Sequence, residues 1–94
     1  MTGTGFPEEE LVEKARSGGS GAFGRLVEHT LAGTWACAWR FTGNQADAED
    51  LVQETYMKAW VGISKFRKQS GFATWLYRID LIIVIPAEAG IQSV

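Results

Sequence analysis

Two long stretches of the chain carry apolar residues at intervals of three and four positions, the spacing of one face of an α-helix. The first runs from Ser20 to Gly43, and the second opens at Asn44 and continues to Ile63. No alternating pattern typical of a strand occurs before residue 81. The faces expected to be buried consist of Phe23, Leu26, Val27, Thr30, Leu31, Thr34, Trp35, Ala38 and Phe41 in the first helix, and of Ala48, Leu51, Val52, Thr55, Tyr56, Ala59, Trp60 and Ile63 in the second.

Two shorter helices are predicted on either side of this pair. The first covers Glu8 to Ser17, behind Pro7, which suits a first helical turn because its missing N–H would have no helical partner there. The other runs through Ile79 with Ser70 as its N-cap. These four segments predict an all-α domain of four helices.

The first long helix has two features that depend on its surroundings. Ser20 is its expected N-cap. Gly33, in its middle, costs about 1 kcal/mol relative to alanine. That glycine is either tolerated or marks a place where another helix passes close by.

Composition limits the classes of function. The 94 residues, 46% of them hydrophobic, form one small packed domain. Cys37 and His29 are the only residues of their types, so an internal disulfide and a Cys/His zinc site are not expected. The longest apolar run, Leu81 to Ile85, is far shorter than the roughly 20 residues that span a bilayer. We expect a cytoplasmic protein without metal, cofactor or membrane insertion.

The chain also lacks the residue patterns of an enzyme. We find no phosphate-binding glycine loop, no convincing pair of carboxylates and no nucleophile beside a base. Enzymatic activity is therefore not expected.

The second long helix carries an acidic flank beside its apolar face. Asp50, Gln53, Glu54 and Met57 recur there at helical spacing. One interpretation is a solvated helix whose acids favour the helix dipole. The other is a surface that binds a basic helix of another protein.

Basic and aromatic residues alternate in the segment KFRKQSGFATWLYR, residues 65–78. Cations that meet phosphates, with rings that stack on unpaired bases, are what single-stranded DNA binding requires. The alternative is that Phe72, Trp75, Leu76 and Ile79 form the core face of a helix. Between Val61 and Ile79 there are four basic residues and no acidic one, whereas Asn44 to Trp60 holds four acids and one lysine. Two partners of opposite charge would explain this segregation.

Three blocks together resemble the second conserved region of bacterial RNA polymerase sigma factors of the extracytoplasmic-function group. They are GAFGRLVEHT, TGNQADAEDLVQETYMKAW and FRKQSGFATWLYRI, in this order and with short connections. The resemblance covers about Glu8 to Ile79 and implies a domain that docks on a coiled-coil clamp of the polymerase's largest subunit. The residues that it implies for this contact are Asp47, Asp50, Leu51, Gln53, Glu54 and Met57.

The resemblance also implies binding to the non-template strand of the promoter minus-ten element. There a base is flipped out and held, so that the strand opens without ATP, and contacts to that base must offset a cost of a few kcal/mol. The residues implied for this role are Lys65, Phe66, Arg67, Lys68, Gln69, Ser70, Phe72, Thr74, Trp75 and Arg78. An anti-sigma factor is a further partner that membership of such a family would allow.

After Ile79 the chain departs from the family pattern. A small residue, then arginine and asparagine, is typical there, whereas this chain continues as DLIIVIPAEAGIQSV. We expect a sigma region 2-like domain over 1–80 and a non-family tail over 81–94, with no room for the helix-turn-helix domain that reads the minus-thirty-five element. The tail resembles translated dispersed repeats of some bacterial genomes, which suggests an insertion or frameshift.

The tail itself has three expected conformations. It extends the last helix to about Val84, covers part of the core, or pairs with another chain as a strand. The function expected is an incomplete transcription initiation module. The alternatives are an interaction decoy that occupies polymerase or an anti-sigma factor, and a translated remnant without a selected role.

Overall fold

A computed structural model describes residues 6–67 and 71–84 and confirms the all-α prediction. The four α-helices are α1 (Glu8–Arg16), α2 (Ser20–Thr42), α3 (Gln45–Gly62) and α4 (Phe72–Val84). A short 3₁₀ turn, η1 (Ile63–Lys65), follows α3. Helix α4 thus continues past Ile79 as far as Val84. Of the three conformations expected for the start of the tail, this agrees with an extension of the last helix.

The helix ends follow local backbone rules, with one correction. Gly19, and not Ser20, is the N-cap of α2, because Ser20 is already helical and the extended Gly19 offers its carbonyl to Phe23 N–H at 3.1 Å. Gly43 ends α2 at φ 77°, a left-handed conformation that glycine adopts without strain. Asn44 then caps α3, since its side chain accepts a hydrogen bond from Asp47 N–H.

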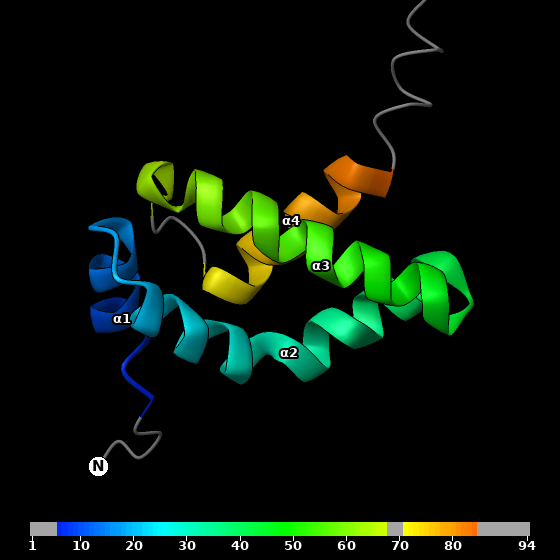
Figure 1. Cartoon of the computed structure of the whole chain (residues 1–94), viewed down its shortest axis with the longest axis horizontal. Coiled ribbons are helices and arrows are strands. Elements are labelled where there is room, and N and C mark those ends of the chain that lie inside the picture. The colour runs from blue at the N-terminus through cyan, green and yellow to red at the C-terminus, as the bar shows by residue number, and fades with distance from the viewer. Residues whose placement is uncertain (1–5, 68–70, 85–94) are drawn as a thin grey trace, which may run out of the picture.

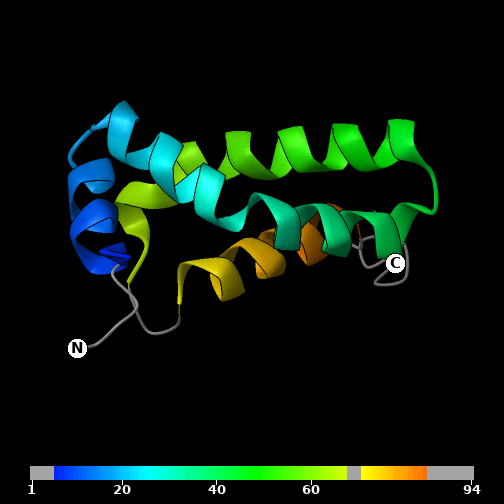
Figure 2. The same cartoon turned by 90° about the horizontal axis from the view of Figure 1, so that it is seen from below.

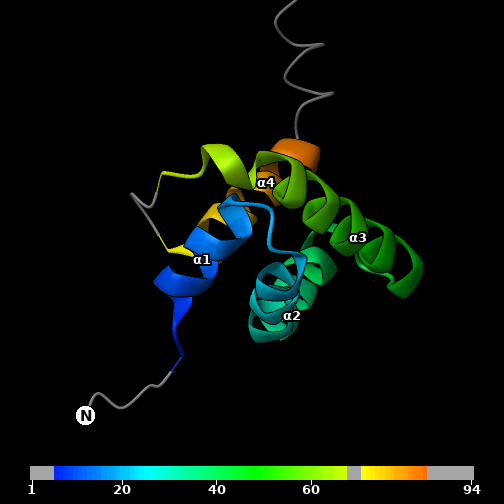
Figure 3. The ribbon, with the colours of Figure 1, turned by 60° about the vertical axis from the view of Figure 1, so that its left-hand side comes forward.

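The two long helices lie side by side and run in opposite directions, because only Gly43 and Asn44 separate them (Figure 2). Helix α4 packs against both long helices (Figure 1). Helix α1 packs against α2 and η1, at the end of the pair that lies away from the Gly43–Asn44 connection (Figure 3). Within the described residues, no helix has an apolar stretch long enough to cross a membrane.

The core has two parts. The smaller is built from Ala38, Ala48, Leu51 and Val52, where α2 and α3 meet. The larger lies where all the helices converge and contains Leu11, Val12, Ala15, Phe23, Leu26, Ala59, Ile63, Phe66, Phe72, Leu76 and Ile79.

Three residues expected in the core are instead exposed. Leu31 is 38% exposed, Phe41 40% and Trp60 40%. On α2 the buried row is Leu26, Thr30, Thr34 and Ala38. Leu31 and Phe41 flank this row, so the buried stripe is narrower than the apolar periodicity predicts.

Gly33 is explained by a close contact between helices. A Cβ atom at this position would collide with the Tyr77 hydroxyl of α4. The glycine therefore lets α4 approach α2, which confirms the second of the two interpretations of Gly33. Its conformational cost in the helix is compensated by this packing.

Buried hydroxyl groups connect the helices across the core. The Tyr56 hydroxyl of α3 lies 2.7 Å from Thr30 Oγ1 and donates to Thr34 Oγ1 at 2.9 Å, both on α2. Burial, partly opposed by these two hydrogen bonds, raises the pKa of Tyr56. The phenol consequently stays protonated at neutral pH and can serve as this donor.

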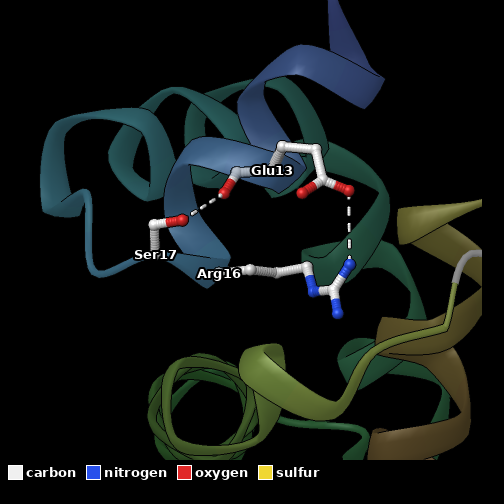
Figure 4. Close-up of polar contacts among 3 residues, drawn as sticks. All are labelled: Glu13, Arg16 and Ser17. Atoms are coloured by element: carbon white, nitrogen blue, oxygen red, sulfur yellow. Dashed lines mark hydrogen bonds and ion pairs between the residues drawn. The ribbon is translucent and has the colours of Figure 1, made fainter.

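The C-terminal end of α1 is held by local contacts (Figure 4). Arg16 pairs with Glu13 at 3.2 Å, and Ser17 Oγ donates to the Glu13 carbonyl oxygen at 3.3 Å. Both contacts are exposed, so each is expected to contribute little to stability. The helix ends at the glycine-rich connection to α2, where Gly18 N–H donates to the Ala15 carbonyl at 2.9 Å and Gly19 N–H to the Lys14 carbonyl at 2.8 Å.

Candidate protein and nucleic-acid interfaces

One exposed face of α3 gathers most of the residues predicted to bind polymerase. Asp50, Gln53, Glu54 and Met57 are all exposed and line a groove of about 580 Å³. Their spacing of three and four positions brings them to one side of the helix. The face combines two carboxylates with Met57, which is 68% exposed, so it offers apolar contact as well as negative charge. We call it the acidic face.

Two of the predicted polymerase contacts lie elsewhere. Leu51 is only 6% exposed and belongs to the smaller core, so its side chain supports α3 from within. Asp47 is exposed but is engaged in the first turn, where its carboxylate accepts a hydrogen bond from Asn44 Nδ2 at 2.9 Å. Its observed role is to close the N-terminus of α3.

The acidic face extends further than the sequence analysis expected. Lys58 and Val61 also line its groove, and Val61 is 78% exposed. Lys58 lies 3.9 Å from the Glu54 carboxylate, an exposed pair that contributes little to stability. The continuation of the helical spacing from Met57 to Val61 was the signal that could have identified Val61.

The segment after α3 separates into exposed cations and a buried ring. Lys65 and Arg67 are exposed, and neither forms an ion pair within the described residues. Phe66 between them is 5% exposed and packs on Trp75, with ring centroids 4.8 Å apart. Lys68, Gln69 and Ser70, also predicted to bind DNA, lie outside the described residues.

Helix α4 shows the same separation. Thr74 and Arg78 are exposed on one side, four residues apart. Phe72 is fully buried, with its ring edge-on to Phe66 and Phe23. The burial of Phe72 agrees with the core interpretation, and the roles of Phe66 and Phe72 at DNA stay a prediction.

Trp75 occupies the boundary between the two surfaces. It is half-buried, and a Cβ atom at Gly62 would lie 3.7 Å from its ring. Gly62 ends α3 and also lines the acidic groove. The Trp75 ring therefore lies near the end of that groove. We call Lys65, Arg67, Thr74, Trp75 and Arg78 the basic face.

A residue that sequence reasoning missed holds the start of α4. The Glu8 carboxylate, from α1, accepts a hydrogen bond from Phe72 N–H at 2.9 Å. Phe72 is the first residue of α4, where an unpaired N–H and the helix dipole both favour a carboxylate. The two residues are 64 positions apart, so no local sequence pattern could have indicated this contact.

Asp80, where the chain departs from the family pattern, lies inside the domain. It is fully buried, and its carboxyl oxygen accepts a hydrogen bond from Thr55 of α3. Cys37 of α2 lies beside it, and burial, together with the Asp80 contact, raises the pKa of this thiol to about 11. Asp80 of α4 is thus enclosed between α2 and α3.

The fold and the two faces define a small helical domain with adjoining acidic and basic surfaces. The Sigma-70 region 2 family matches residues 26–79, more than half of the chain. The chain therefore belongs to the Sigma-70 region 2 family, which confirms the resemblance.

The chain is also similar to proteins named as RNA polymerase sigma factors. The RNA polymerase sigma-H factor of Pseudomonas aeruginosa is 37% identical over 77 residues, which are 79% of this chain and 38% of that protein. The ECF RNA polymerase sigma factor SigW of Bacillus subtilis is 34% identical, over 82% of this chain and 41% of its own length. The chain thus spans about two fifths of these relatives.

A solved structure shares the fold. An NMR structure of an engineered region 2 of sigmaE in complex with GTAAAA superposes with a TM-score of 0.78. The two sequences are 28% identical, and the match covers 90% of this chain and 88% of that one.

Proposed function

We propose that this chain is a sigma region 2-type module that binds core RNA polymerase through the acidic face and single-stranded promoter DNA through the basic face. The observation that carries the proposal is the adjacency of the two faces. Trp75 packs on Phe66, and its ring lies 3.7 Å from where a Cβ atom of Gly62 would be, so the basic face adjoins the end of α3. This adjacency lets a polymerase-bound domain present DNA in one orientation.

The proposed contact with polymerase rests on the exposed residues of the acidic face. Asp50 and Glu54 supply negative charge, and Met57 and Val61 supply apolar surface in the same groove. A helical partner with basic and apolar residues would complement this face. The coiled-coil clamp of the largest polymerase subunit is the proposed partner.

For DNA, we assign direct contacts to the exposed residues of the basic face and a supporting role to the buried rings. Lys65, Arg67 and Arg78 would meet phosphates, and Thr74 and the accessible part of Trp75 would meet bases. Phe66 and Phe72 would hold the segment that carries these groups. The structural relative's complex with GTAAAA supports this oligonucleotide as a probe.

The proposed activity is that of a cytoplasmic and non-enzymatic region 2-type initiation module. Residues 1–80 would provide the region 2-type domain, and 81–94 would form a tail foreign to it. The family match ends at Ile79, which supports this division.

The first experiment measures binding of the purified chain to sigma-free core polymerase by size-exclusion chromatography. We expect co-migration that is lost with Glu54→Lys, because the substitution reverses a charge in the acidic groove. Glu49→Lys is the matched control, since Glu49 is exposed on the same helix but does not line that groove.

The outcomes separate the functions considered above. Loss with Glu54→Lys alone supports the proposed interface. Equal loss with both variants would indicate non-specific attraction. A chain that is folded by circular dichroism but never binds polymerase would contradict the proposal and leave ancestry as the explanation of the resemblance. Polymerase binding without any binding of GTAAAA would favour the decoy.

A further inference from the structure

A second groove, of about 390 Å³, lies between α2 and α4, apart from both proposed interfaces. Helix α2 lines it with three residues that are small, Gly33, Ala36 and Cys37, and these leave room for a bound molecule. The exposed apolar side chains of Phe41 and Leu81 line it as well. Its volume and its mostly apolar lining are those of a site for a small organic molecule.

One unpaired cation lies among these apolar groups. Among the described residues that line the groove, Arg40 alone is charged. It is exposed and forms no ion pair within the part of the chain that the structure describes. The guanidinium group offers paired N–H donors that match the two oxygens of a carboxylate. A single arginine is matched by one negative charge, whereas a polyanion needs several cations.

We propose that the groove binds a small amphipathic carboxylate, with its charged end at Arg40 and its apolar body between α2 and α4. From Arg40 to Gly33 the groove follows α2 over about 10 Å, at 1.5 Å per helical residue. Tyr77 closes the Gly33 end, because its hydroxyl stands where a side chain at Gly33 would be. A monocarboxylate with a short unbranched chain, such as octanoate, is the probe that these dimensions indicate.

The Cys37 thiol adds no competing charge to the groove. Burial, together with the Asp80 contact, raises the pKa of Cys37 to about 11, so the thiol stays protonated at neutral pH. A protonated cysteine behaves as a small apolar side chain. The α2 wall next to Arg40 is therefore neutral, which suits the apolar body of the ligand.

The test titrates octanoate into the isotope-labelled full chain and follows the backbone amide signals by NMR. We expect saturable shifts of the Gly33, Cys37 and Leu81 amides. Arg40→Gln should weaken octanoate binding about three- to tenfold, because it removes a charge-assisted contact. Arg25→Gln is the matched control, since Arg25 is exposed on the same helix but does not line the groove.

Two further comparisons separate the charged end of the ligand from its apolar body. Octanol lacks the carboxylate, so Arg40→Gln should leave its affinity unchanged. Acetate lacks the apolar body and should give no saturable shifts. Ala36→Leu should abolish octanoate binding by filling the groove. Ala32→Leu, at an exposed position of α2 that does not line the groove, should not.

Several results would overturn the proposal. Octanoate binding that survives Ala36→Leu, or that falls equally with Ala32→Leu, would place the ligand elsewhere. Binding abolished by Ala36→Leu but unaffected by Arg40→Gln would refute the carboxylate assignment. A folded chain without saturable shifts would refute the site altogether. A dimer in solution that becomes monomeric with Ala36→Leu would assign the groove to a second copy. None of these variants lies in the acidic or basic face, so each result is independent of polymerase and DNA binding.

Discussion

The acidic and basic faces were predicted with the same kind of reasoning, but they differ in how the predicted residues are placed. On α3, five of the six predicted residues are exposed, and Leu51 alone belongs to the core. Among the residues predicted to bind DNA, the polar residues of the basic face are exposed, while Phe66 and Phe72 are buried beneath it. Periodicity sorts a long helix into two sides, whereas Phe66 follows η1, outside any α-helix, where no period assigns its ring.

The comparison suggests a division of labour within the basic face. Its cations are available to a polyanion, and its phenylalanine rings fix the backbone that presents them. Four sets of substitutions test this division and the seating of α4 that supports it, from the largest expected effect to the smallest.

Phe66→Ala should lower the free energy of unfolding by about 3–5 kcal/mol, because it leaves a cavity among Phe72 and Trp75. Urea denaturation followed by tryptophan fluorescence measures the change. The exposed Thr74→Ala should alter stability by about 0.5 kcal/mol or less. If Phe66→Ala left stability unchanged but abolished DNA binding, Phe66 would belong to the DNA-contacting surface and the division would be wrong.

Arg67→Ala combined with Arg78→Ala should weaken binding to the GTAAAA oligonucleotide without affecting folding. Since both side chains are exposed, the slope of log affinity against log salt should fall in magnitude by about 1.4, or roughly 0.7 for each phosphate that the protein no longer neutralises. Fluorescence anisotropy over a salt series gives this slope. Arg25→Ala, an exposed arginine of α2, is the control, and an equal change with it would indicate that overall charge governs binding.

Gly33→Ala should destabilise the domain by about 1 kcal/mol, because the added methyl group meets the Tyr77 hydroxyl and forces that side chain to shift. In a Tyr77→Phe background the obstacle is removed, and the same substitution should stabilise by up to about 1 kcal/mol through helix propensity. Thermal unfolding of the four proteins completes the cycle. Equal effects in both backgrounds would disprove the proposed contact and with it the account of how α4 is seated.

Glu8→Ala should loosen the start of α4 and cost about 1 kcal/mol or less, as the loss of a helix cap does. Hydrogen exchange of the Phe72 amide should become faster, since the substitution removes its acceptor. Glu9→Ala removes an equal charge from the exposed side of α1 and serves as the control. Unchanged exchange at Phe72 would mean that another group caps α4.

The sequence by itself determined the four helices, the exposed acidic row on α3 and the family. These properties depend on periodicity, on local capping and on ordered blocks of residues, and all of these can be read along the chain. It also indicated that Gly33 could mark a close approach between helices, although it could not name Tyr77 as the neighbour.

Only the tertiary structure decided which aromatic rings face inward, that Glu8 caps α4, and that Asp80 is enclosed beside Thr55 and Cys37. Each of these depends on contacts between residues far apart in the chain. Burial is a property of the neighbours that packing brings together, and no local pattern around Phe66 or Asp80 specifies those neighbours.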